Sequence, residues 1–173
     1  MKIILAPDSF KGTFTAGQVS DSLAAGVKTV LPEARVVKLP LADGGEGTLE
    51  TLLAAKGGAV HSCKARDPAG REIEVEYGVL PGGEALVEMA RSSGLALLAE
   101  NERNPWVVGT YGLGMVILAA LEQKIQALTI TLGGSATVDG GVGMARALGY
   151  RFLGSRGELI SQEGGRVLSE ISR

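Results

Sequence analysis

The sequence predicts an α/β protein in which a parallel sheet with helices precedes part of a second α/β domain. Short apolar runs alternate with helical patterns over residues 1–58, which is typical of parallel strands joined by crossover helices. The pattern then changes to two-residue alternation, which indicates an antiparallel meander over residues 59–89. We therefore expect a boundary near residue 58, with residues 59–173 forming the second α/β portion.

The first segment predicts two strand–loop–helix units. The apolar run 3–6 indicates a short strand buried on both faces. Thr15 and Gln18 stand at capping-box spacing, and apolar residues then recur at helical intervals. A second strand is expected over residues 36–41, followed by a helix that ends at Gly57-Gly58.

The meander of the second segment centres on an alternating strand over residues 72–79, which has turn sequences on both sides and is flanked by strands over 59–65 and 85–89. Beyond the meander the pattern predicts four more elements: a helix over 107–121 with Ile117, Leu118 and Leu121 on one face, a strand over 128–132, a short helix over 142–148 and a strand over 150–153.

Composition argues against several classes of protein. A net charge of -2 and an aromatic content of 4% argue against a nucleic-acid partner. No apolar run approaches the roughly 18 residues of a membrane span, so no membrane role is expected. The single cysteine, Cys63, cannot form an internal disulfide, which fits a cytoplasmic protein.

Three glycine-rich loops, each containing an aspartate, follow three apolar strand-like runs. They cover residues 6–13, 42–48 and 133–141. In an open parallel sheet such loops gather at the carboxyl edge, where ligands bind. Glycine lets backbone N–H groups approach an anion, and aspartate supplies a metal ligand or a base. Together the loops predict phosphate and polyol chemistry.

The first loop places Asp8, Ser9, Lys11 and Gly12 within one turn. Lys11 can hold a phosphate or a carboxylate as a point charge. The spacing differs from G-x-x-x-x-G-K-[ST], so this is not a Walker A loop. The alternative is a structural turn in which Asp8 is a cap and Lys11 is solvated.

The second loop packs Asp43, Gly44, Gly45, Glu46 and Gly47 together. Asp43 and Glu46 could share a Mg²⁺ ion, which favours carboxylate oxygens together with water and substrate phosphate. A tight turn in which Glu46 favours the helix N-terminus is the alternative. A surface turn rarely needs three glycines, so the composition favours a site.

The third loop is the richest anion cradle. Gly133, Gly134, Ser135 and Ala136 can present successive N–H groups as a nest. Asp139 could take Mg²⁺ or begin the next helix. The alternative is a long strand-to-helix turn.

A weaker signal lies at Arg103 and Asn104. Arg103 can grip a carboxylate with two parallel hydrogen bonds, although a loop arginine is more often simply exposed. His61 and Cys63 share one face of an alternating strand, and two ligands are too few to propose zinc.

At these motifs the chain resembles the bacterial type of glycerate kinase, the glycerate 2-kinase family. Residues 6–12, 42–48, 102–105 and 133–137 look like that family's motifs and keep their order. The resemblance implies a cytoplasmic enzyme that transfers the γ-phosphoryl group of ATP to D-glycerate and gives 2-phosphoglycerate. It also implies two α/β domains with a cleft between them, the N-terminal sequence supplying part of a Rossmann-like domain.

The hypothesis of a phosphotransferase assigns a task to each motif. Glycerate would be held by Ser9, Lys11, Gly12, Arg103 and Asn104. Phosphate or nucleotide would be cradled by Gly44, Gly45, Gly133, Gly134, Ser135 and Ala136. Mg²⁺ or the acceptor would be organised by Asp43 and Glu46. The hydroxyl proton would go to Asp8 or Asp139, between which the sequence does not choose.

The chain departs from the family's pattern in three ways. The family's chains are about twice as long, so this chain looks like an N-terminal portion. Val138 stands where the family usually has Asn, and Leu113 and Met115 replace Thr and Glu. Two other functions therefore stay open: a catalytically silent fragment that binds an anion or pairs with itself or a partner, and an acid-sugar isomerase or phosphatase that uses the loops without ATP.

Overall fold

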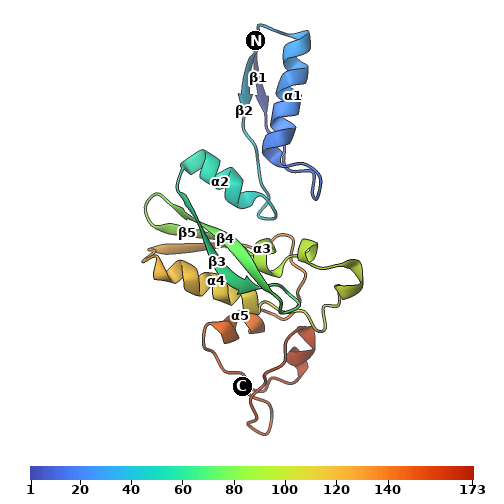
Figure 1. The fold of residues 1–173 in the computed structure, drawn as a ribbon, viewed down its shortest axis with the longest axis vertical. Helices are drawn as coiled ribbons and strands as arrows, with labels where there is room; N and C mark the ends of the chain where they lie inside the picture. The colour runs from blue at the N-terminus through green and yellow to red at the C-terminus, as the bar shows by residue number, and fades with distance from the viewer.

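Two separate sheets organise the chain (Figure 1). The computed structural model describes residues 1–173. Four strands form the larger sheet in the order β3 (Ala59–Arg66), β4 (Glu72–Leu80), β5 (Glu84–Glu88) and β6 (Ala127–Thr131). Its first three strands are antiparallel, and β5 and β6 are parallel. The predicted α/β class and the meander are confirmed.

Residues 1–38, here called the lobe, project from the rest of the chain (Figure 1). Here β1 (Lys2–Leu5) and β2 (Arg35–Lys38) pair in parallel, joined by α1 (Ala16–Val30). The capping box is present, since the Gln18 N–H donates to Thr15 Oγ1 at 3.2 Å and the Thr15 N–H donates to Gln18 Oε1 at 2.9 Å.

One expectation for the lobe is wrong. Ile4 of β1 is 56% exposed, whereas a strand buried on both faces was expected. The physical reason is that two strands and one helix offer too little surface to cover both faces of this sheet.

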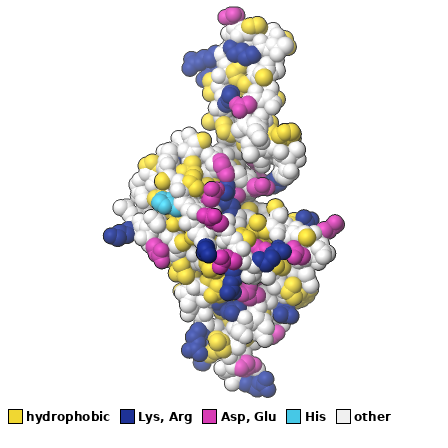
Figure 2. All heavy atoms as spheres, viewed as in Figure 1, with side chains coloured by type: hydrophobic (Ala, Val, Ile, Leu, Met, Phe, Trp, Pro, Cys, Tyr) yellow, Lys and Arg dark blue, Asp and Glu magenta, His cyan; other side chains and the backbone are white.

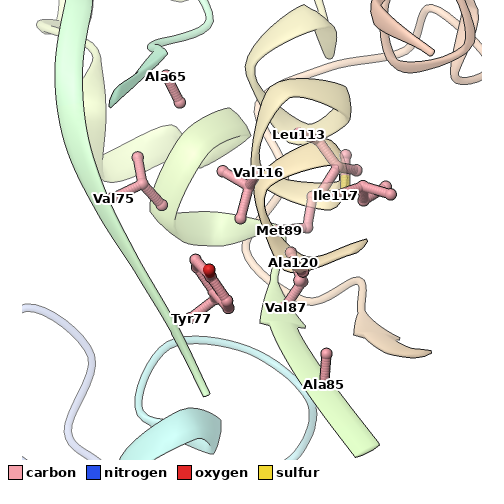
Figure 3. Packing of buried hydrophobic residues seen from close by; sticks show 10 residues of the cluster. All are labelled: Ala65, Val75, Tyr77, Ala85, Val87, Met89, Leu113, Val116, Ile117 and Ala120. Atoms are coloured by element: carbon pink, nitrogen blue, oxygen red, sulfur yellow. The ribbon is translucent and has the colours of Figure 1, made fainter. Parts of the chain in front are cut away.

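The core lies in the second region, residues 48–149, here called the body. Tyr77 and Val75 of β4 point towards Val116 of α4 (Tyr111–Glu122), with Val87 of β5 beside them (Figure 3). The Tyr77 hydroxyl donates to the Ala119 carbonyl oxygen at 3.2 Å, which satisfies its polar end inside the core.

The expected face of the fourth helix is partly wrong. Ile117 is buried, but Leu118 is 43% exposed and Leu121 is 51% exposed. The buried side instead carries Leu113, Val116, Ile117 and Ala120. The helix is apolar all round, so periodicity alone could not select the face that packs. It also begins at Tyr111 instead of residue 107.

Helix α2 (Thr48–Lys56) packs on β4 and β5 although it follows β2 in the chain. Gly78 lies beneath it, where a Cβ atom would stand 2.7 Å from Leu49 Cδ1. We therefore propose that the junction between the two regions lies in residues 39–47 rather than near residue 58.

The C-terminal part of the chain contains α5 (Val142–Ala147) and a 3₁₀ turn at Gly165–Ser169. The strand expected over residues 150–153 is wrong, because only an isolated bridge joins Leu153 to Leu159. The remaining short elements are α3 (Ala90–Ser93) and two 3₁₀ turns, Leu95–Leu97 and Glu100–Glu102. None of the helices is both long and apolar enough to span a membrane.

Candidate functional site

A cleft of about 1220 Å³ opens between the lobe and the body. Figure 2 shows acidic and basic side chains gathered where the two regions meet. Arg103 lines this cleft, and so do residues of all three glycine-rich loops: Lys11, Gly12, Gly45, Glu46, Gly47 and Gly134. The loops meet as the sequence predicts, but they come from two sheets and not from one carboxyl edge.

The second and third loops are in direct backbone contact. The Gly133 N–H donates to the Gly44 carbonyl oxygen at 2.9 Å. A Cβ atom at Gly133 would lie 2.5 Å from the Cα atom of Gly45, so only glycine permits this approach. The strand β6 thereby holds the second loop at the mouth of the cleft.

The predicted nest of four free N–H groups is wrong. The Gly133 N–H is bonded to Gly44, and the Ala136 N–H donates to the Ser93 carbonyl oxygen at 2.9 Å. The N–H groups of Gly134 and Ser135 have no acceptor within the protein. Two adjacent amides therefore remain for an anion instead of four.

An ion pair joins the first loop to the second. Lys11 Nζ lies 3.3 Å from Asp43 Oδ2, and the Gly45 N–H donates to Asp43 Oδ1 at 2.9 Å. The Gly45 N–H, and next the Lys11 ammonium, lower the pKa of Asp43. Both side chains are more than half exposed, so the pair is weak and a ligand can exchange with it.

The first loop carries one unsatisfied hydroxyl group. Asp8 Oδ1 accepts the Ser9 N–H at 2.6 Å, while Ser9 Oγ is buried and has no hydrogen-bond partner. Ser9, Lys11 and Gly12 line a smaller hollow of about 220 Å³, which Glu46 also borders. Because buried hydroxyls are normally paired, Ser9 is available to a ligand in this hollow.

Asp139 is not on the cleft. Its carboxylate is 1% exposed and accepts hydrogen bonds from the Thr110 N–H and Oγ1 at 2.9 and 2.8 Å. It also accepts the N–H groups of Gly141 and Gly143 at 3.0 and 3.1 Å. The carboxylate therefore fastens the start of α5 to the start of α4, and it has no free oxygen aimed at a substrate.

Arg103 and Asn104 differ in placement. Arg103 lines the cleft and makes no ion pair. Asn104 Oδ1 instead accepts the Trp106 N–H at 3.1 Å, which is a local turn contact. The structure therefore places Arg103, but not Asn104, among the lining residues.

Sequence reasoning missed Glu88 and Arg91. Glu88 is 1% exposed, ends β5 and accepts the N–H groups of Gly47 and Leu49 at 3.2 and 3.1 Å. Burial raises the pKa of Glu88. Arg91 lies among three carboxylates of the cleft wall: Glu50, Glu76 and Glu88. The available signal was a glutamate that closes an otherwise apolar run, Ala85-Leu86-Val87.

A metal would find few protein ligands here. No group of three or more His, Cys, Asp or Glu residues is arranged to hold an ion. Asp43 and Glu46 are both exposed in the second loop. Two carboxylates suit Mg²⁺, which commonly keeps several waters and takes substrate phosphate as its other ligands.

The residues that depart from the resemblance have packing tasks or are exposed. Leu113 is 2% exposed in the core, and Met115 packs against that core. Val138 is 58% exposed. Leu113 and Met115 therefore act on the packing of α4 and not on the lining of the cleft.

Several known proteins that this chain resembles carry glycerate kinase names. Glycerate kinase of Bacillus subtilis (strain 168) is 43% identical over 173 residues, which cover 99% of this chain and 45% of that protein. Glycerate 2-kinase of Escherichia coli (strain K12) is 40% identical over 168 residues, 96% of this chain and 44% of that protein. A crystal structure from Salmonella typhimurium LT2, assigned to glycerate kinase 2, matches 99% of this chain and 46% of its own at a TM-score of 0.79 and 38% identity.

The chain thus spans about half the length of the relatives that it matches. The family model described as the glycerate kinase family matches residues 3–173. Because the match covers nearly the whole sequence, the chain belongs to the glycerate kinase family.

Proposed function

We propose that this chain is the N-terminal portion of an enzyme that phosphorylates D-glycerate at its 2-hydroxyl with ATP. One observation carries the proposal: three glycine-rich loops, the first of which carries Lys11, reach a single cleft that Arg103 also lines. Phosphoryl transfer depends mainly on positioning and charge stabilisation, which such loops supply. The relatives' names, glycerate kinase and glycerate 2-kinase, support the choice of acceptor. We also propose a cytoplasmic location, which fits a single cysteine, Cys63, that forms no disulfide.

The acceptor would bind at the first loop. Lys11 and Arg103 supply two cationic groups for the glycerate carboxylate, and Ser9 Oγ supplies an unpaired hydroxyl for a substrate oxygen. Gly12 leaves the loop open beside them, since nothing lies within 4 Å of the position of a Cβ atom there. Asn104 would shape the turn that carries Arg103.

The phosphate groups would bind at the second and third loops. The free N–H groups of Gly134 and Ser135 suit an anion, and Gly44, Gly45 and Gly133 keep the two backbones close together. Ala136 would anchor this loop through Ser93.

Asp43 and Glu46 would hold Mg²⁺ when it is bound, and the ion would neutralise charge on the phosphates. The exposed Asp43 carboxylate can exchange Lys11 for the ion, and this exchange would release Lys11 to the substrate.

Asp8 suits the role of proton acceptor better than Asp139. The Asp139 carboxylate is enclosed by four hydrogen bonds, whereas Asp8 has one, from the adjacent Ser9 N–H. A base must lie within hydrogen-bond reach of the hydroxyl that it serves. Asp8 begins the loop that carries Ser9 and Lys11, so we assign it this task.

A second candidate function is a fragment that acts only after pairing with a partner or with a copy of itself. Seven large apolar side chains of the lobe are exposed: Met1, Ile4, Phe10, Phe14, Leu23, Val30 and Leu31. Large bare apolar patches are rare on monomers. The segment that makes up the other half of the relatives would be the natural partner.

An assay on D-glycerate, paired with an intact mass in solution, tests both candidates. Asp43→Asn should leave folding unchanged and abolish ATP-dependent turnover in the complete enzyme, while Asp21→Asn, an exposed aspartate of the lobe, should change neither. Unchanged turnover in Asp43→Asn would remove Asp43 from the site. Turnover without nucleotide would favour an isomerase or phosphatase. A species of 17.8 kDa that is monomeric and inactive, but active with the missing half, would support the fragment.

A further inference from the structure

We propose that Glu88 is the positioning residue that fixes the second glycine-rich loop, Asp43–Gly47, over the cleft. The observation is a juxtaposition across 41 residues of sequence: Glu88 Oε1 accepts the Gly47 N–H at 3.2 Å. Its other oxygen, Oε2, accepts the Leu49 N–H at 3.1 Å. The positioning role rests on the proposed function, whereas the two hydrogen bonds do not.

The first N–H groups of a helix need acceptors from outside the helix. Usually the N-cap side chain supplies one, but the N-cap of α2 is Gly47, which has no side chain. Glu88 replaces that cap from β5, and its negative charge also suits the positive end of the helix. The start of α2 is therefore set by a residue of the sheet, not by its own sequence.

The loop is held from a second side by Gly133, whose N–H bonds to the Gly44 carbonyl oxygen. β5 and β6 are parallel neighbours, and Glu88 pairs with Thr131 two residues before Gly133. Glu88 therefore holds the Gly47 end of the loop and Gly133 holds the Gly44 end, and the two lie at or just beyond the ends of adjacent strands. Asp43 and Glu46, which carry its carboxylates, are placed by these contacts.

The buried Glu88 carboxylate has one charged neighbour, Arg91, which other carboxylates also attract. Arg91 Nε lies 3.7 Å from Glu88 Oε2, and Arg91 is itself drawn to Glu50 of α2 and Glu76 of β4. No other charged group of these elements is paired with Glu88. A buried ion pair is weak evidence for stability, because the loss of hydration offsets its attraction. The positioning role therefore rests on the two hydrogen bonds to the Gly47 and Leu49 amides.

Glu88→Gln tests the proposal directly. Glutamine offers one acceptor oxygen and one NH₂ donor, so only one of the two amides can stay bonded. We expect hydrogen exchange at Gly47 or Leu49 to become about tenfold faster. The dissociation constants of D-glycerate and of Mg·ATP should rise by a similar factor. Glu84→Gln is the control on the same strand, because Glu84 accepts a hydrogen bond from Thr129 Oγ1 at 2.6 Å and pairs with Lys56 at the other end of α2, and does not contact the loop.

Unchanged exchange at both amides in Glu88→Gln would overturn the proposal. Faster exchange with unchanged ligand affinity would overturn the positioning role. The affinities are measured on the complete enzyme. If its wild-type form binds neither ligand, the proposed function fails, and exchange alone then decides whether Glu88 fixes the loop. Should Glu88→Gln not fold, Glu88→Asp keeps the charge but shortens the reach, with the same expected result. In wild type, both amides should exchange about tenfold more slowly than the Glu46 amide, which has no acceptor; equal rates would also overturn the proposal.

Discussion

The strand–loop–helix pattern of the lobe recurs in the body at β6 and α5, yet the two regions differ in burial. The lobe's only buried apolar residues are Ala16, Val19 and Ala34. The body instead has a continuous ten-residue core between Ala65 and Ala120. The pattern therefore predicts how strands connect, while burial depends on how many elements surround them.

The sheets explain the difference. In the body, Tyr77 faces α4 while the adjacent Gly78 lies under α2, so both faces of β4 are covered. In the lobe, β1 and β2 have two open edges and only α1 beside them (Figure 1). The sheet of the lobe is therefore covered far less completely than the sheet of the body.

Truncating a leucine to alanine in each region tests the difference in burial most directly. Leu113→Ala in α4 removes a side chain that is 2% exposed, and we expect a loss of about 3 kcal/mol in unfolding free energy. Leu23→Ala in α1, where the side chain is 46% exposed, should cost less than about 1 kcal/mol. Urea denaturation measures both. Similar losses would show that the lobe is as well packed in solution as the body.

Replacing one aspartate in each region tests whether polar contacts differ between the body and the lobe in the same way. Asp139→Ala leaves four donors unpaired, three of them in buried hydrogen bonds, and should cost about 3 kcal/mol. Asp21→Ala in the lobe removes only an exposed pair with Lys38, and should change stability by less than about 0.5 kcal/mol. Thermal unfolding of both variants checks this. A loss of unfolding free energy well below about 3 kcal/mol in Asp139→Ala would mean that Asp139 does not stabilise the junction of α4 and α5.

Local features of the fold could be predicted from the sequence, and long-range ones could not. The Thr15–Gln18 capping box and the helix end at Gly57 depend on neighbouring residues, so both were predicted correctly. The Asp139–Thr110 contact joins residues 29 apart, and nothing in either local pattern reveals it.

Long-range contacts at the candidate site could likewise not be predicted from local sequence patterns. The glycine-rich loops reach one cleft as expected, but the expectation assumed a single sheet and the structure has two. The contact of Glu88 with Gly47 depended on α2 crossing to the body's sheet, which local patterns do not encode. The nest at residues 133–136 lost two amides for a related reason, since their acceptors lie on the second loop and on α3.

A pH titration tests Glu88, one of the buried acids of the body. Burial raises the pKa of Glu88 above its value in the unfolded chain. Its contribution to stability is therefore full below the unfolded pKa and is lost as pH rises through the folded pKa. The unfolding free energy of wild type minus that of Glu88→Gln should therefore fall as the pH rises above the ordinary range of a glutamate, about pH 4. Urea denaturation at rising pH measures it, and a rising difference would show that the hydrogen bonds outweigh burial.

The smallest expected effect uses the single cysteine as a probe of the body. Cys63 is half-buried on β3 and packs against the core, and burial raises the pKa of its thiol. Because the thiolate is the nucleophile, a raised pKa and limited access both slow alkylation. In a Cys63→Ala background, Leu23→Cys places a thiol on the exposed face of α1 as the matched comparison. At pH 7.5 we expect Cys63 to react with iodoacetamide about tenfold more slowly than that thiol, with a rate that keeps rising towards pH 9. Equal rates would mean that β3, the outer strand of the body's sheet, opens as readily as the lobe, and the contrast between the two regions would then be confined to the strands and helices around α4.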